Sequence, residues 1–134
     1  MANIDLAHAT SLLQYSLANG SGAPVATTGN LHARLMTANG TNTVNGTELP
    51  TSASYVAVTG ITPVTFAAAA AGATSNSNTL TQTNMPASTI VGAELWDSSG
   101  TPHRLWFGAL SASKTVNLGD TFSIAIGAMT LGIS

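Results

Sequence analysis

The last third of the sequence, residues 91–134, is a succession of short apolar–polar alternations separated by turn residues. Successive side chains of a strand point to opposite faces, so an alternation with period two predicts strands with one buried face. The alternation breaks at residues 97–100, 112–113 and 119–120, where Asp, Ser and Gly favour turns. Several short strands with turn residues between them suggest a β-sandwich or a jelly-roll-like barrel.

Earlier parts of the chain contain further strand-like stretches. Residues 31–36 alternate, with Leu31, Ala33 and Leu35 on one face. Further strands are predicted at residues 55–59, 63–66, 89–97, 103–110, 114–118, 121–126 and 129–133. The predicted fold class is mainly β, an antiparallel β-sandwich or jelly-roll-like barrel with one N-terminal helix.

Residues 4–18 are predicted to form the helix, because apolar side chains recur there at helical spacing, at Leu6, Ala9, Leu13 and Leu17. Gly20 would end it in a left-handed conformation. We therefore expect residues 1–20 to form a helix that packs on or beside the sheet, and residues 21–134 to form a single β-sandwich domain. Docking of the helix on a neighbouring subunit remains the alternative to packing on its own sheet.

Charge is scarce in this sequence. Charged residues make up 6% of the chain, against about 25% in typical domains, and residues 49–93 contain none. One explanation is a monomer with a neutral, Thr-rich surface. The other is a subunit whose strand edges and neutral faces are covered by copies or neighbours, since interface cores are poor in charge. The second explanation predicts a homo-oligomer, expected to be a trimer, with interface residues Tyr55, Val56, Val58, Ile61 and Leu80.

The composition also argues against several functions. Without Cys the chain has neither disulfides nor a Cys-based metal site. A net charge of -2 with three basic residues lacks the basic surface that nucleic-acid binding needs. No apolar run reaches the roughly 20 residues that span a bilayer, and the N-terminus lacks the pattern of a secretory signal. We therefore expect neither nucleic-acid nor membrane partners, and assembly in the cytoplasm of the cell that makes the chain.

The residues that could do chemistry are few. His8, His32 and His103 lack ligand spacing, so neither a metal site nor a cofactor is expected. A hydrolytic site would need Ser98, His103 and Asp97 to converge, and no oxyanion hole or nucleophile elbow accompanies them. For Asp97, a turn cap is the simpler interpretation.

Two tryptophans belong to the same predicted hairpin. Trp96 and Trp106 are expected to face each other across it. They would then form either a cross-strand packing pair or a platform for a saccharide. The packing interpretation is favoured, because aromatic pairs often fix the register of neighbouring strands.

Four segments carry a resemblance to a known family. They are TIVGAELWD at 89–97, LWFGAL at 105–110, SKTVNLGDT at 113–121 and AMTL at 128–131. Their order resembles that of a family of short tailed-bacteriophage virion proteins, named tail-fibre or minor tail proteins, some of which decorate capsids. The resemblance implies a structural protein without enzymatic activity.

Three roles are open under this resemblance. The chain encodes neither a shaft nor a repeat, which favours a capsid decoration or cement protein that binds the major capsid protein and stabilises the head lattice. The alternative is a tail-tip or short tail-fibre subunit that binds a host-surface glycan. A free glycan-binding or adhesin module is a third possibility. For the first two, the expected location is the virion, assembled in the host cytoplasm.

Overall fold

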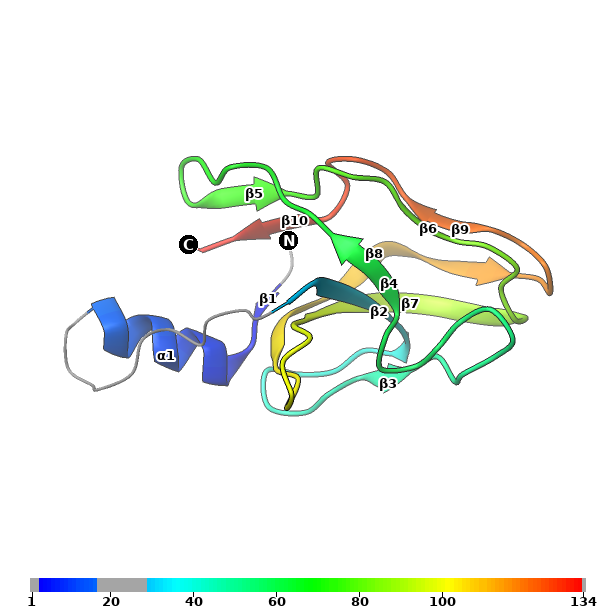
Figure 1. Cartoon of the computed structure of the whole chain (residues 1–134), viewed down its shortest axis with the longest axis horizontal. Coiled ribbons are helices and arrows are strands. Elements are labelled where there is room, and N and C mark those ends of the chain that lie inside the picture. The colour runs from blue at the N-terminus through cyan, green and yellow to red at the C-terminus, as the bar shows by residue number, and fades with distance from the viewer. Residues whose placement is uncertain (1–2, 17–28, 134) are drawn as a thin grey trace.

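The structure, a computed structural model, describes residues 3–16 and 29–133 of the chain. In chain order its elements are β1 (Asn3–Ile4), α1 (Leu6–Ser16), β2 (Leu31–Ala38), β3 (Thr47–Glu48), β4 (Ile61–Val64), β5 (Ala73–Ser75), β6 (Leu80–Gln82), β7 (Ser88–Trp96), β8 (Arg104–Val116), β9 (Phe122–Ile124) and β10 (Thr130–Gly132). The predicted fold class is confirmed: the chain is mainly β, with antiparallel strands and one short N-terminal helix (Figure 1). The division into residues 1–20 and 21–134 stays a prediction.

The larger sheet is built around β7 and β8. Its strand order is β1-β8-β7-β2-β3, and β4 also pairs with β2. Every one of these pairings is antiparallel. Glu94, Leu95 and Trp96 are all buried, although they alternate between the two faces of β7. Both faces of this sheet are therefore covered at the end of β7.

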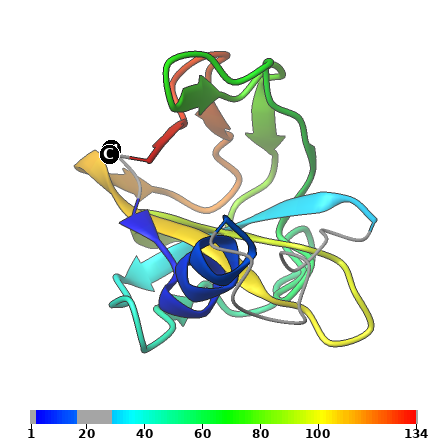
Figure 2. The same cartoon turned by 90° about the vertical axis from the view of Figure 1, so that its left-hand side faces the viewer.

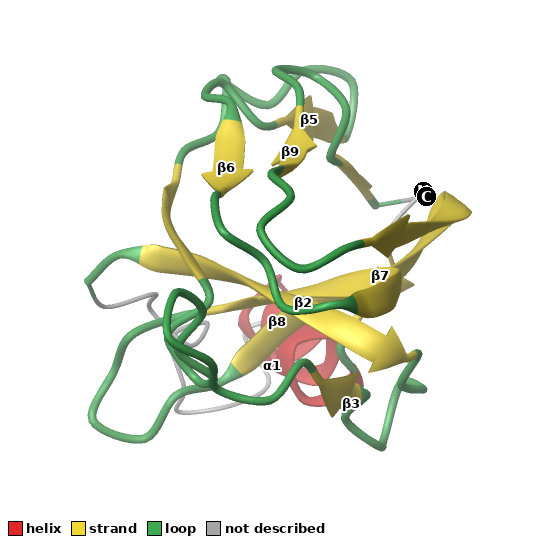
Figure 3. Cartoon of the chain, turned by 90° about the vertical axis from the view of Figure 1, so that its right-hand side faces the viewer, coloured by secondary structure: helices red, strands yellow, loops and turns green. Residues whose placement is uncertain are grey.

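Two small sheets form the second layer of the sandwich. They pair β10 with β5 and β6 with β9, and they lie across from the larger sheet (Figure 3). The core between the layers joins Leu35 and Leu95 of the larger sheet to Leu80, Phe122 and Ile124 of the second layer. Each of these side chains is at most 9% exposed, and burying a side chain of this size stabilises the fold by about 1.5–3 kcal/mol.

The helix begins later than predicted because the chain enters it from a strand. β1 pairs with β8 before the helix starts, and Asp5 then caps α1, its Oδ1 accepting a hydrogen bond from the backbone N of Ala7 at 2.9 Å. α1 lies on the side of the larger sheet opposite the second layer (Figure 2). Leu6 and Leu13 remain 48% and 60% exposed, so only part of the apolar stripe is covered. Leu17 and the predicted glycine end lie outside the described residues.

β8 is interrupted by a long bulge. Ile90 of β7 pairs with Lys114, but Gly92 pairs with Ala109, so β8 has surplus residues between these two partners. A bulge bends its strand and leaves part of its backbone without a ladder partner. Here the bulge lies between two parts of β8 that pair with β7, one from Arg104 to Ala109 and the other from Lys114 to Val116.

Candidate functional site

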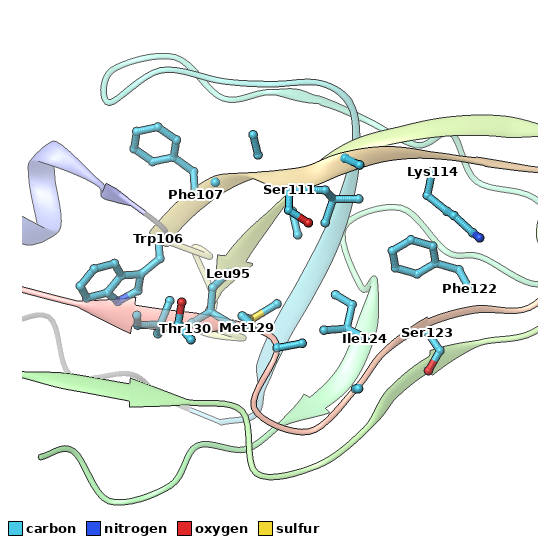
Figure 4. A pocket seen from close by; sticks show the side chains of 18 residues that line it. Leu95, Trp106, Phe107, Ser111, Lys114, Phe122, Ser123, Ile124, Met129 and Thr130 are labelled. Carbon is cyan, nitrogen blue, oxygen red and sulfur yellow. The ribbon is translucent and has the colours of Figure 1, made fainter.

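A groove of about 640 Å³ runs between β8 of the larger sheet and β9 and β10 of the second layer (Figure 4). Most of its lining side chains are apolar, with Leu95, Trp106 and Met129 towards one end and Phe122 towards the other, although polar groups contribute a substantial part of its surface. Lys114, beside Phe122, is the one charged side chain among its lining residues. The groove can therefore accept an uncharged occupant that has both apolar and polar groups.

All three strands that border this groove have an edge without a partner strand among the described residues. β8 pairs with β1 only at Trp106 and Phe107, so no strand lies beside its outer edge from Gly108 to Thr115. β9 pairs only with β6, and β10 only with β5. Free N–H and C=O groups on a strand edge are a template for another chain. We call the groove between β8, β9 and β10 the seam, because it is where the two layers remain unjoined.

The opposite face of the larger sheet holds a buried network of charges centred on Arg104. Its Nε and Nη2 donate hydrogen bonds to Oδ2 of Asp5 at 3.0 and 2.8 Å, and its Nη1 donates to Oε1 of Glu94 at 3.0 Å. Nη1 and Nη2 also donate to the carbonyl oxygens of Val44 and Thr41, at 2.9 and 2.6 Å. The Arg104 side chain is only 3% exposed. It therefore joins the start of α1, the loop after β2, and β7 from within the fold.

A second part of the network surrounds Arg34. Its guanidinium carbon lies 3.9 Å from the ring centroid of Trp96, and its Nη1 lies 3.8 Å from Oε2 of Glu48. The Tyr55 hydroxyl donates to Oε1 of Glu48 at 2.9 Å and accepts from the backbone N of Leu35 at 3.0 Å. Burial raises the pKa of Tyr55, so the phenol stays protonated and keeps its donor.

These contacts leave the exterior almost without free charge. The chain has three basic and five acidic residues, and most of them are engaged in ion pairs on the side of the larger sheet that faces away from the seam. Within the described residues, Lys114 and Asp120 are the two charged side chains outside these contacts, among which the contact of Asp97 with His103 is an ion pair only when the histidine is protonated. Asp120 accepts a hydrogen bond from the backbone N of Asn117 at 2.8 Å, which closes the turn after β8. Because most of the charged groups contact one another within the fold, the surface carries even less charge than the composition suggests.

Asp97 and His103 meet in the turn between β7 and β8, together with the hydroxyl group of Ser99. Oδ1 of Asp97 accepts hydrogen bonds from the backbone N of His103 at 2.7 Å and from Oγ of Ser99 at 3.1 Å. Both Oδ2 of Asp97 and Oγ of Ser99 lie 3.3 Å from the same ring nitrogen, Nδ1 of His103. In a hydrolytic triad the nucleophile and the carboxylate use different ring nitrogens. The cluster is therefore arranged as a turn-closing group.

The electrostatics of Asp97 agree with this role. Burial by itself would raise the pKa of Asp97, but hydrogen bonds from His103 and Ser99 outweigh it and lower the pKa below its usual 3.8. The carboxylate is consequently ionised at neutral pH and acts as an acceptor for the turn.

The two tryptophans lie on opposite faces of the larger sheet. Trp106 is opposite Leu95 in the β7–β8 ladder and points into the seam, whereas Phe107 lies on the other side of β8 (Figure 4). Trp96 is buried beneath Arg34, with its Nε1 donating to Oε2 of Glu94 at 3.1 Å. The prediction that Trp96 and Trp106 face each other is wrong, because Trp106 pairs with Leu95 and the next residue of β7, Trp96, points to the opposite face of the sheet. They do not form a joint saccharide platform.

The five predicted interface residues divide into two groups. Tyr55, Ile61 and Leu80 are at most 6% exposed and belong to the core, so the folded domain does not offer them to a partner. This corrects their assignment: their apolar character reflects packing between the layers. Val56 and Val58 are 54% and 58% exposed and remain available.

Neither metal ligation nor a membrane span is indicated in the described part of the chain. Residues 3–16 and 29–133 contain no group of three or more His, Cys, Asp or Glu side chains placed to hold a metal ion. None of their helical residues forms a helix long and apolar enough to cross a bilayer. His8 and His32 are instead partly buried, and burial lowers the pKa of His8.

The fold and the seam define a small β-sandwich protein with an open strand edge and a nearly uncharged exterior. Comparison with family models then gives a match to Podophage GP4 fiber I protein gp80 over residues 8–132. The chain belongs to this family, which confirms the resemblance to short-tailed phage virion proteins and makes it a virion structural protein. A comparison with curated proteins finds no match.

Sequence reasoning did not identify the seam. Its residues are small or apolar and carry no motif, and whether a strand has a free edge depends on the order of strands in the sheet. The one local signal was the stretch at residues 108–113, in which every side chain but that of Leu110 is small, and this is unusual in a strand that packs on both faces.

Proposed function

We propose that the chain is a non-enzymatic subunit of the fibre of a short-tailed phage. The observation that carries this proposal is the match to a fibre protein family across residues 8–132. It favours the tail-fibre alternative over the capsid decoration role, which rested on the absence of a shaft or repeat in the sequence. The major capsid protein is accordingly not part of the proposal.

The surface of the domain supports a role in assembly. A fibre subunit must hold its neighbours through its own faces, and interface cores are depleted in charged residues. Here the charges are engaged within the fold, while the seam carries one lysine and a free strand edge. The proposed partners are therefore copies of the same chain, with a trimer as the expected number.

The absence of enzymatic activity is part of the same proposal. The Asp97, Ser99 and His103 cluster supports it, since its hydrogen bonds converge on one histidine nitrogen and on the backbone of its own turn. Neither a cofactor nor a metal enters the proposed function.

A host-surface glycan has less support than a protein partner. Trp96 is covered by Arg34, which leaves Trp106 as the one tryptophan open to a ligand. Saccharide sites combine an aromatic surface with several convergent polar groups, whereas most of the side chains that line the seam are apolar.

Virions produced without this chain test the proposed role. A fibre subunit predicts that particles fill and retain DNA normally on heating but adsorb to host cells much less well than wild-type particles. Supplying the wild-type chain from a plasmid is the control and should restore adsorption. Heads that lose DNA at lower temperature, with adsorption unchanged, would instead support a cement protein and overturn the proposal.

A further inference from the structure

We propose that the seam is filled by an extended segment of a second copy of this chain, hydrogen-bonded along the outer edge of β8. The proposal rests on the fibre role only for its setting, since it specifies how two copies join. It assigns the contact to residues 108–115 and the facing strands β9 and β10, in the C-terminal part of the chain.

The outer backbone edge of β8 is accessible to such a contact. Ala109 and Ser111 to Thr115 are exposed, and no strand covers this edge within the described residues. The side chains here are mostly small, with Gly108, Ala109 and Ala112 among those that line the groove. Small side chains let another backbone approach closely, and edge-to-edge addition supplies main-chain hydrogen bonds that the isolated domain lacks.

The shape and chemistry of the seam favour a strand over other ligands. It lies between the free edges of strands from both layers, so an extended segment placed there would contact β8 on one side and β9 or β10 on the other. Side chains on one face of that segment would meet the partly exposed apolar side chains of Trp106, Leu110 and Met129. A strand of about 5–6 residues, the commonest length, is enough for this contact.

Charge complementarity identifies the partner as another copy. A strongly charged partner would lose its hydration in the seam and gain at most Lys114 as a counter-ion. This chain carries no such excess: outside its ion pairs the described residues leave one cation, Lys114, and one anion, Asp120. Lys114 lies near the end of β8 and Asp120 follows that end. Each copy therefore carries one positive and one negative side chain that complement those of another copy.

Exposed apolar side chains next to the seam strands also favour a second copy as the partner. Leu118 follows β8, Ile126 follows β9 and Ile133 follows β10, and they are 80%, 64% and 66% exposed. Large apolar side chains that flank a free edge lose contact with water when a second copy is added. The contact would thus combine backbone pairing in the seam with burial at its ends.

Hydrogen exchange of the unmodified protein is the first test and needs no substitution. At concentrations where sedimentation shows an oligomer, the outward amides of residues 109–115 should exchange much more slowly than at dilutions where the chain is a monomer. An oligomer in which these amides exchange as fast as in the monomer would overturn the proposal, and so would a chain that is monomeric at every concentration.

A matched pair of substitutions locates the contact. Ala112→Lys adds a charge inside the seam and should weaken self-association about tenfold or more, since an unpaired charge in an interface is costly. Ala53→Lys makes the same change on the exposed loop before Val56 and should leave association unchanged. Dissociation by Ala53→Lys and not by Ala112→Lys would contradict the proposal and place the interface near Val56 and Val58.

Two further outcomes separate this proposal from its alternatives. Saccharide binding that is abolished by Trp106→Ala, with exchange at residues 109–115 slowed only by the sugar, would assign the seam to a glycan and overturn the strand contact. Detection of the chain on phage heads would overturn the fibre role, whereas protection of residues 109–115 in the same oligomer would still support the strand contact.

Discussion

Nη2 of Arg104 lies 2.8 Å from Oδ2 of Asp5, and this ion pair joins residues that are 99 positions apart in the sequence. Asp5 also caps α1, so one carboxylate serves both the start of the helix and the strand β8. The helix makes little other use of its apolar stripe, since Leu6 and Leu13 are largely exposed. Arg104 therefore adds a side-chain contact to the β1–β8 pairing and to the hydrogen bond from Leu6 N to the carbonyl oxygen of Asn42, which also attach the start of α1 to the sandwich.

Removal of Arg104 should destabilise the whole domain. In Arg104→Met the buried carboxylates of Asp5 and Glu94 lose their counter-ion, and breaking a buried pair in this way costs about 3–5 kcal/mol. Urea unfolding of the variant should show a loss of this size. Lys114→Met is the control, and its exposed side chain predicts a change of no more than about 0.5 kcal/mol. Equal unfolding free energies for the two variants would contradict the described network.

Tyr55 should contribute to stability through its hydroxyl group. Tyr55→Phe leaves the ring in the core but removes the bridge between Glu48 and the backbone N of Leu35. A buried donor left without its acceptor costs about 1–3 kcal/mol, so the free energy of unfolding should fall by that amount. A variant as stable as wild type would show that the bridge is not formed in solution.

The two tryptophans should differ in fluorescence. Trp96 is 9% exposed and stacked under Arg34, whereas Trp106 is partly exposed in the seam. Trp106→Phe, which leaves only Trp96, should emit at shorter wavelength and resist quenching by iodide. Trp96→Phe, which leaves only Trp106, should be quenched in the monomer and protected in the oligomer. Identical quenching of the two variants in the monomer would contradict their placement on opposite faces.

Acid should loosen the turn between β7 and β8 through Asp97. Because hydrogen bonds lower the pKa of Asp97 below 3.8, the stabilisation it provides is complete above that value. It is lost as the pH falls through the lower pKa of the folded state. The backbone amide of His103 donates to Asp97. Its protection from hydrogen exchange, measured relative to the intrinsic exchange rate at each pH, should therefore fall only in that acid range.

The matched variant for this effect is Asp97→Asn. It should destabilise the protein by about 1–3 kcal/mol at pH 7, because a buried and hydrogen-bonded acceptor is weakened, and it should remove the acid transition of the turn. Retention of that transition in Asp97→Asn would assign it to another group.

Much of the fold could be predicted from the sequence, because alternation and turn residues are local signals. The helix α1 lies within the predicted residues 4–18, and β2 and β7 overlap the strands predicted at 31–36 and 89–97. β8 joins the strands predicted at 103–110 and 114–118 across the break expected at 112–113, whereas residues 57–59 of the strand predicted at 55–59 form a turn. The faces of the two tryptophans could not be predicted, since they depend on the register between β7 and β8, which places Leu95 and not Trp96 opposite Trp106.

The candidate site is formed by segments that are distant from one another in the sequence, so local sequence patterns could not predict it. Nothing near Gly108 or Ala112 in sequence shows that β1 covers only the beginning of β8. Likewise, the burial of Tyr55 and Leu80 follows from the packing of the second layer on the first, and an uncharged stretch is compatible with a core as well as with an interface. The scarcity of charge was visible, but its concentration around Arg104 and Arg34 required the structure.

The location of the chain in the virion tests the central claim most directly. Gold-labelled antibodies or an appended tag, seen by electron microscopy on intact particles, show whether the chain belongs to the tail fibres or the head. The fibre proposal predicts label on fibres at the tail end of the particle, and loss of that label in virions made without the chain. Label distributed regularly over the head would contradict the proposal and restore the capsid decoration role.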